Sequence, residues 1–389
     1  MALSENILSI NQPPDLDNKW LYLIMKIGIL GSRGIPNRYG GFEQLAQYLS
    51  VGLAKKGHEV FVYNPHHHSY QEKKWNDVNI IHCKDPEYNV GTIGQFIYDR
   101  NCISDSFTRS FDILLHLGYT SDSIWHERWP KKAIHIINMD GLEWRRNKYN
   151  FLTKRFLKWA ESLAARHADL LIADSLAIEE YLLTNYNKSS IYIPYGAEIF
   201  TGANENVLRK YDVQPYHYSL GIARLEPENN IGTIIRGYIT SKQKDPLVIV
   251  GTLSNNYGKS LFRKYKNSNV IFTGGIYDPE DLNNLRCFSA FYFHGHSSGG
   301  TNPSLLEAMA CGCNIVAHDN VFNKCILGND ANYFSSEMDI AGLLSLSKEK
   351  SLTETHKESN LQKINSIYNW EKVINSYEEA MLKALNSRR

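Results

Sequence analysis

The sequence predicts an α/β protein made of two doubly wound, Rossmann-like domains that face each other across a cleft. Short apolar segments of strand length alternate with segments of helical periodicity, which is the pattern of a parallel sheet covered by helices on both faces. The pattern runs once to about residue 192 and restarts near residue 218, and 389 residues are enough for two such domains. Because ligands bind beyond the carboxyl ends of parallel strands, both halves are expected to contribute to one site.

The first half follows an expected N-terminal extension at residues 1–24, where Pro13 and Pro14 stand among polar residues. A helix is predicted at residues 42–56, because leucines recur there at helical spacing and Gly57 follows as a stop. Buried strands are expected at residues 25–31, 59–63, 79–82, 113–117, 134–138 and 170–173. These elements define an N-terminal domain at residues 25–195.

The second half begins after a linker at Pro194-Tyr195-Gly196. Its strands are expected at residues 218–222, 247–250, 270–273, 290–293 and 314–317. They define a C-terminal domain at residues 196–368. The last segment, residues 369–389, is an amphipathic helix that we expect to pack back on the N-terminal domain.

Composition narrows the class of protein. The 42 basic and 41 acidic residues nearly cancel, so no global field points to nucleic acid. Six cysteines without metal-site spacing indicate reduced thiols of a cytosolic protein, and three consecutive histidines from His66 cannot all face one metal. Apolar runs are too short for a spanning helix or a signal peptide. The sequence therefore predicts a cytoplasmic protein with no metal site, whose membrane role, if any, is peripheral.

The most informative stretch is residues 296–312, where a glycine-rich loop leads directly into an apolar helix. Glycine lets backbone N–H groups approach a ligand closely, and a helix start adds a positive dipole end. Gly300, Thr301 and Asn302 belong to the loop, and Glu307 lies about one turn inside the helix. The stretch predicts a site for phosphate or sugar hydroxyls, in which Glu307 accepts hydrogen bonds from hydroxyls.

A second glycine-rich loop, residues 31–43, follows the first strand, so a dinucleotide site must be considered. A ribose of NAD requires Asp or Glu after the second strand, where this chain has Tyr63-Asn64-Pro65. The loop is therefore interpreted as a cover over a phosphate or sugar, and the alternative is a tight turn without a ligand. Its candidate residues are Arg33, Gly40, Gly41 and Glu43.

Charged residues follow two other predicted strands. Asp140, after residues 134–138, could orient or deprotonate an acceptor hydroxyl, and Arg145 could hold an anionic group. In the second half, Arg224 could clamp a diphosphate, with Glu228 and Asn229 in the same crevice. The alternatives are a surface salt-bridge cluster in the first case and a capping loop in the second.

Residues 144–160 combine basic and aromatic side chains and contain no acidic residue. A basic, aromatic helix of this kind can lie on an anionic membrane surface, and an ordinary solvated helix face is the equal alternative.

The order and spacing of these motifs resemble those of family 4 glycosyltransferases of the GT-B fold, over nearly all of the chain from Met25. The supporting segments are residues 168–175, 193–197, 274–278 and 305–310. The subgroup that the chain resembles is the bacterial β-1,4-rhamnosyltransferases acting on lipid-linked sugars, through residues 31–36, 138–144, 227–230 and 299–304. Two positions depart from the general family: the first Glu of its Glu-x7-Glu motif falls on Gly299, and its diphosphate lysine falls on Asn229.

The resemblance implies a retaining transferase that needs neither a cofactor nor a metal. Its donor would be a nucleoside diphosphate sugar, with dTDP-rhamnose as the first candidate, and its acceptor a lipid-diphosphate-linked saccharide of bacterial surface polysaccharide synthesis. Arg224, Asn229, Glu307 and the loop at residues 300–302 would bind the donor, and Asp140, Arg145 and Glu228 would serve catalysis. A GT-B sugar-nucleotide epimerase and a non-catalytic carbohydrate-binding protein are the alternative functions.

Overall fold

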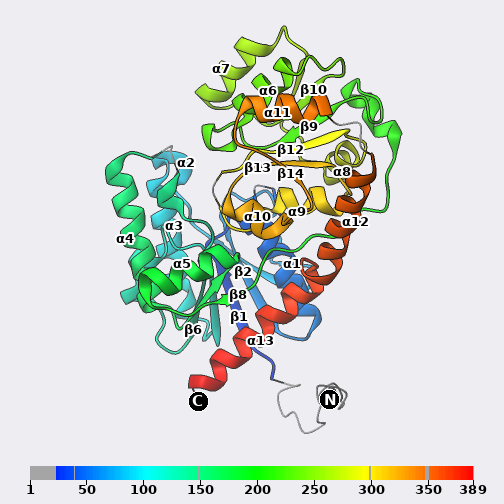
Figure 1. Ribbon diagram of the computed structural model, residues 1–389. Helices are drawn as coiled ribbons and strands as arrows, with labels where there is room; N and C mark the ends of the chain where they lie inside the picture. Colours follow the sequence, from blue (N-terminus) through cyan, green and yellow to red (C-terminus); the bar gives the residue numbers. More distant parts are fainter. Residues whose placement is uncertain (1–22, 39, 147–148, 298, 347–349, 389) are drawn as a thin grey trace, which may run out of the picture.

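The computed structural model describes residues 23–388 except 39, 147–148, 298 and 347–349 (Figure 1). The extension predicted at residues 1–24 therefore lies almost entirely outside the described residues.

The N-terminal domain is built on a sheet of eight strands in the order β3-β4-β2-β1-β5-β6-β7-β8. All neighbours pair in parallel except β3 and β4. The strands are β1 (Lys26–Leu30), β2 (Glu59–Pro65), β3 (Lys74–Trp75), β4 (Val78–Cys83), β5 (Ile113–Leu117), β6 (Ile134–Asn138), β7 (Leu170–Ala173) and β8 (Ile191–Tyr192). Its helices are α1 (Gly41–Lys55), α2 (Glu87–Val90), α3 (Ile93–Ser106), α4 (Phe151–His167) and α5 (Leu176–Tyr186).

The C-terminal domain has a six-stranded parallel sheet in the order β11-β10-β9-β12-β13-β14. Its strands are β9 (Ser219–Ile222), β10 (Leu247–Val250), β11 (Val270–Gly274), β12 (Phe291–His294), β13 (Ile315–His318) and β14 (Asn332–Phe334). Its helices are α6 (Ile231–Thr240), α7 (Asn256–Tyr265), α8 (Pro279–Cys287), α9 (Pro303–Ala310), α10 (Val321–Leu327), α11 (Glu337–Leu346) and α12 (Lys350–Ser366).

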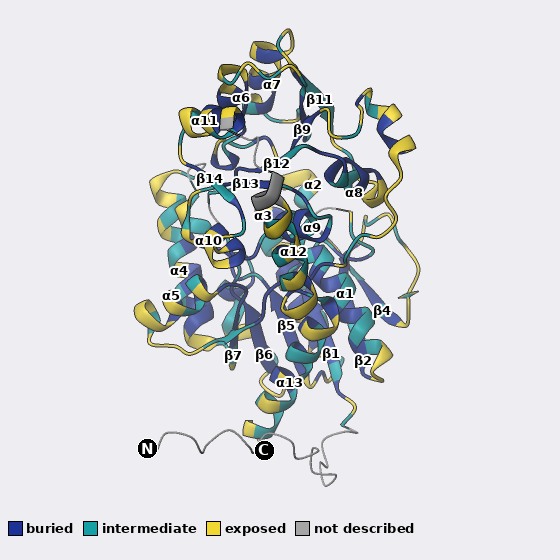
Figure 2. Cartoon of the chain, turned by 45° about the vertical axis from the view of Figure 1, so that its right-hand side comes forward, coloured by how far each residue is buried: buried dark blue, intermediate teal, exposed yellow. Residues whose placement is uncertain are grey.

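The predicted fold class is confirmed: two parallel sheets form two Rossmann-like domains. In Figure 2 the strands are largely buried, whereas many helices turn an exposed face outward. The predicted strands match the observed ones within about two residues, but the sequence did not reveal β3, β8 and β14. These three strands have only two or three residues and lie at or next to sheet edges, so they carry too little hydrophobic pattern to be recognised.

The last helix, α13 (Trp370–Arg388), leaves the C-terminal domain and packs on the N-terminal one (Figure 1). Trp370 stacks on Tyr48 of α1 with 4.3 Å between ring centroids. Farther along, the hydroxyl of Tyr377 accepts a hydrogen bond of 2.7 Å from Asn138 Nδ2, and Glu378 pairs with Lys56 at 2.7 Å. The helix thus connects the two domains. None of the helices in the described parts of the chain is long and apolar enough to cross a membrane.

Candidate active site

Loops at the carboxyl ends of both sheets meet at the interface between the domains. A Cβ atom on Gly141, after β6, would lie 2.6 Å from Cα of Gly299, after β12, so the two backbones pack directly against each other. At the start of α1, a Cβ on Gly41 would lie 3.2 Å from Cγ of Pro303, the first residue of α9. Both predicted glycine-rich loops therefore lie at this interface.

Asp140 lies at the centre of this region. Its backbone φ is +35°, and its N–H donates to the side-chain oxygen of Asn138 at 3.0 Å, which fixes the turn that leaves β6. Burial raises the pKa of the Asp140 carboxyl, and the charges of Arg146 and Arg224 act in the opposite direction. The Asp140 carboxyl thus has a raised pKa, and its charge interacts with one arginine from each domain.

Arg146, rather than Arg145, is the arginine that joins this group. Its guanidinium contacts Glu143 at 2.6 Å and Glu228 of the C-terminal domain at 3.3 Å. Arg145 is exposed, and its guanidinium lies over the rings of Trp144 and Tyr181, at 5.2 and 5.9 Å from their centroids. The structure therefore does not bring Arg145 together with Asp140.

A buried carboxylate holds the two rings over which Arg145 lies, those of Trp144 and Tyr181; we call these rings its aromatic support. Glu161 of α4 has no exposed surface and accepts hydrogen bonds from Trp144 Nε1 at 3.0 Å and from the hydroxyls of Tyr181 and Tyr186 at 2.6 Å each. Because Trp144 is held in this way, the short 3₁₀ helix at Glu143–Arg145 has a fixed orientation.

The loop after β9 presents a second group of predicted residues. Arg224 is exposed, and its charge lowers the pKa of both Asp140 and His296. Asn229 is buried and donates its side-chain amide to the backbone oxygen of Arg224 at 2.8 Å, so it shapes this loop. Glu228 is also buried; its Oε1 pairs with Arg146, and its Oε2 has no partner among the described residues.

The loop before α9 is held mainly by the N-terminal domain. The backbone N–H of Thr301 donates to Asp174 Oδ2 at 2.9 Å, and the Thr301 hydroxyl donates to the Asp174 carbonyl oxygen. Gly300 lies directly against the same carboxyl group. Asn302 caps α9 by accepting the N–H of Ser304 at 3.0 Å. The backbone N–H and hydroxyl of Thr301 and the side-chain oxygen of Asn302 therefore already have hydrogen-bond partners within the protein.

Glu307 lies inside α9, as predicted from the sequence, but it already has two partners. Its Oε1 accepts from Gln44 Nε2 of α1 at 3.0 Å, and its Oε2 accepts from Arg286 Nη2 at 2.5 Å. The Arg286 side chain is almost fully buried, whereas 30% of the Glu307 side chain remains exposed. Glu307 is thus a held carboxylate with accessible surface, which suits hydrogen bonding to a hydroxyl.

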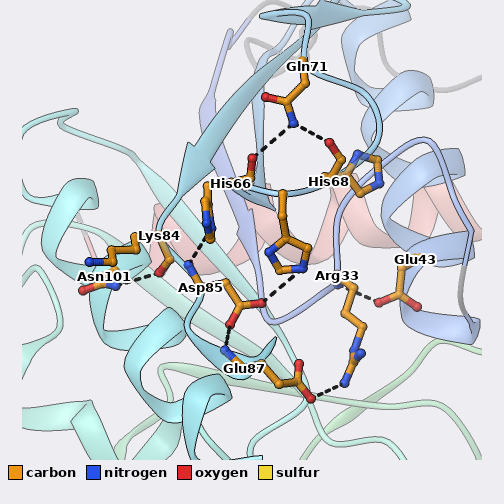
Figure 3. A network of polar contacts seen from close by, with 10 residues as sticks. Arg33, Glu43, His66, His68, Gln71, Lys84, Asp85, Glu87 and Asn101 are labelled. Atoms are coloured by element: carbon orange, nitrogen blue, oxygen red, sulfur yellow. Dashed lines mark hydrogen bonds and ion pairs between the residues drawn. The ribbon is translucent and has the colours of Figure 1, made fainter. Parts of the chain in front are cut away.

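The loop of residues 31–40 is organised by Glu43. Its buried carboxylate accepts the backbone N–H of Arg33 at 2.7 Å, and burial raises its pKa (Figure 3). The Arg33 guanidinium pairs with Glu87 at 2.8 Å. Glu43 therefore fixes the loop. Gly40 lies beside the Glu43 carboxylate, and Gly41 brings the start of α1 against Pro303 at the start of α9.

The neighbouring histidines bind to the backbone. Nδ1 of His66 accepts the backbone N–H of Asp85 at 3.0 Å (Figure 3), and Nδ1 of His68 accepts that of Tyr70 at 3.2 Å. In the described ranges we find no cluster of three potential metal ligands.

Several residues of the interface were not among the predicted site residues: Gln44, Arg146, Asp174, Arg286 and His296. Asp174 follows a buried strand, as Asp140 does, so the same signal could have identified it. Burial and the charges of Arg224 and Arg146 lower the pKa of His296 to about 3, so this imidazole is neutral near pH 7. Arg286 and Gln44 carry no sequence signal, because their role depends on contacts with distant Glu307.

Parts of the chain match known protein families. Residues 208–362 match the family described as glycosyl transferases group 1, and residues 124–198 match a domain of unknown function, DUF1972. An uncharacterized glycosyltransferase of Methanocaldococcus jannaschii is 24% identical over 404 residues, which cover 93% of this chain and 99% of that protein.

Solved structures show the same fold. Sucrose-phosphate synthase from Thermosynechococcus elongatus has a TM-score of 0.78 at 13% identity, covering 93% of this chain and all of the other. Anabaena HepE in complex with UDP-glucose has a TM-score of 0.72 at 14% identity, covering 92% and 99%. The structural neighbours are GT-B glycosyltransferases, and together the matches support a transferase of the glycosyltransferase class.

Proposed function

We propose that this glycosyltransferase transfers a sugar from a nucleoside diphosphate donor to a hydroxyl of a lipid-diphosphate-linked saccharide. The observation that carries the proposal is the position of Asp140, which precedes Gly141 where the loops of both domains pack together, and whose charge interacts with those of Arg146 and Arg224. A carboxylate whose charge interacts with a cation from each domain fits a reaction in which an acceptor hydroxyl must be oriented while charge develops on a leaving phosphate.

The donor is proposed to lie on the C-terminal domain. Arg224 is exposed, and no ion pair to it is found within the described part of the chain, so its charge is available for a diphosphate. Glu307 would accept a hydrogen bond from a ribose hydroxyl through its accessible surface. Asn229 would contribute indirectly, by holding the Arg224 backbone. With Arg224 and loop N–H groups supplying positive charge, we propose that the reaction needs no metal ion and no other cofactor.

The acceptor hydroxyl is proposed to approach from the N-terminal domain. Asp140 would orient it, and the leaving phosphate would take its proton on the same face of the sugar, so that the anomeric configuration is retained. Arg145, on its aromatic support, would hold an anionic group of the acceptor, and Glu228 would keep Arg146 in place. The loop pinned by Glu43, with Arg33, Gly40 and Gly41, would close the site from the side of α1. The subgroup likeness makes L-rhamnose from dTDP-rhamnose the first donor to test.

The decisive experiment measures nucleoside diphosphate release from dTDP-rhamnose, UDP-glucose, UDP-GlcNAc, GDP-fucose and GDP-mannose, with and without a lipid-diphosphate-linked sugar. We expect release from one donor only when the acceptor is present, with the sugar recovered on the lipid. Conversion of a donor without acceptor would instead support the epimerase. Donor binding without turnover would support a carbohydrate-binding protein, and adding EDTA tests the metal-free reaction.

We further propose that helix α4 carries a surface that binds an anionic membrane. This surface would keep the enzyme at the cytoplasmic face of the membrane. On α4, Phe151, Leu152 and Trp159 expose 70%, 75% and 50% of their surface among lysines and arginines of the same helix. Phe156 of α4 contacts Phe96 of α3, with 5.7 Å between centroids, so α3 continues this face. Apolar side chains beside cations suit the interface of a bilayer that contains anionic lipid.

Replacing Phe151, Leu152 and Trp159 together by serine is expected to weaken binding to phosphatidylglycerol-containing vesicles by about tenfold or more, because their burial in the interface is lost. Co-sedimentation with and without phosphatidylglycerol measures this change. Tyr277→Ser, at an equally exposed aromatic residue of the other domain, is the matched control. Equal binding of the triple variant and the wild type would remove this surface from the proposal.

A further inference from the structure

Asp174 is an unassigned carboxyl group at the junction of the two domains. It follows β7 of the N-terminal sheet and has no exposed surface. Its Oδ2 accepts the N–H of Thr301, and its backbone oxygen accepts the Thr301 hydroxyl. A Cβ on Gly300 would collide with both carboxyl oxygens, so only glycine fits there. Asp174 therefore contacts the glycine-rich loop of the other domain at two successive residues.

The surroundings of Asp174 do not favour a second negative charge. Its Oδ1 is buried and has no hydrogen-bond partner among the described residues. Burial and the charge of Asp140 raise its pKa well above the ordinary value, and only the N–H groups of Thr301 and of Asp174 itself act against them. The hydroxyls of Tyr192, Tyr195 and Tyr377 also interact with its charge. Among the described residues, no ion pair brings a cation to Asp174 that would compensate its ionised form.

We infer that Asp174 is a positioning residue that acts as a neutral carboxylic acid. Its Oδ2 fixes the loop of residues 299–302 against the N-terminal domain. Its proton removes a negative charge from beside Asp140, in a group where Arg146 already pairs with Glu143 and Glu228. The part of the inference that concerns Asp140 rests on the proposed function, whereas the neutral state and the contact with Thr301 do not.

The neutral state has a definite consequence for stability. A carboxyl whose pKa is higher in the folded than in the unfolded protein stabilises the fold fully below the unfolded value, about 4. That contribution is lost as the pH rises through the folded value. The side-chain amide in Asp174→Asn would resemble the neutral acid at every pH, because its oxygen can accept the Thr301 N–H. Asp174→Asn should therefore not lose stability in this way as the pH rises. Asp174→Ala removes both the titrating group and the acceptor of the Thr301 N–H.

The first measurement is thermal unfolding of the full chain from pH 4 to pH 9 for wild type, Asp174→Asn and Asp174→Ala. We expect the melting temperature of Asp174→Asn, relative to wild type, to increase with pH and then to level off. Asp77→Asn, at an exposed aspartate, is the control and should show no such trend. A difference between Asp174→Asn and wild type that does not change with pH would overturn the neutral state.

The second measurement is steady-state transfer with the donor found above. Asp174→Ala should lower kcat/KM for the donor by about tenfold to 100-fold, because a buried N–H of the loop loses its acceptor. The loss should exceed any change in the acceptor KM, and Asp174→Asn should restore activity to within about threefold of wild type. Wild-type activity in Asp174→Ala, or equal losses in both variants, would overturn the positioning role. If wild type itself transfers no sugar, the proposed function fails, and the unfolding experiment still decides the state of Asp174.

Discussion

Asp140→Asn is expected to lower kcat by about 10²-fold, because the reacting hydroxyl loses a charged hydrogen-bond partner that orients it. The amide keeps the size of the side chain but does not carry the negative charge. Because Asp140 lies beside Arg146 and Arg224, its loss should affect kcat more than donor binding. Steady-state kinetics with isothermal titration of the donor separates the two effects. Asp77→Asn serves as the surface control, and near-normal kcat in Asp140→Asn would refute the assignment.

The pH dependence gives the same prediction a second readout. Activity that needs ionised Asp140 rises with pH through the pKa of this carboxyl, and burial places that pKa above the ordinary value. Arg146 opposes this shift. Arg146→Met should therefore move the acidic limb of the kcat profile to higher pH. A limb that stays in place in Arg146→Met would show that another group controls it.

Arg224→Ala is expected to lower kcat by about 10²- to 10³-fold, because one preorganised donor to the developing negative charge is lost. Arg224→Lys should recover only part of the activity, since an ammonium supplies the charge without the two-pronged geometry of a guanidinium. Arg236→Ala is the matched control: this exposed arginine lies in the same domain and pairs with Glu337 at 2.6 Å. A similar loss in Arg236→Ala, or none in Arg224→Ala, would contradict a diphosphate site at Arg224.

Much of the candidate site could be predicted from the sequence because it lies at strand ends. Asp140 and Arg224 directly follow buried apolar strands, and parallel strands bring their carboxyl ends to one edge of a sheet. Glu307 could be found from its place in a helix after a glycine-rich loop. The choice between Arg145 and Arg146 could not be predicted. It depends on the short 3₁₀ helix that Trp144 and Glu161 hold, and adjacent side chains there point in different directions.

The sequence by itself determined the two parallel sheets, because burial of strands and helices requires a periodic pattern of apolar residues that can be recognised within a short segment. It also determined which loops reach the interface, since topology follows from the order of strands and helices. Only the tertiary structure decided how the loops are held. Asp174 meets Thr301, and Arg286 and Gln44 meet Glu307, through contacts between residues far apart in the chain. Such contacts depend on how the two domains pack against each other, and the periodicity of either domain carries no information about that packing.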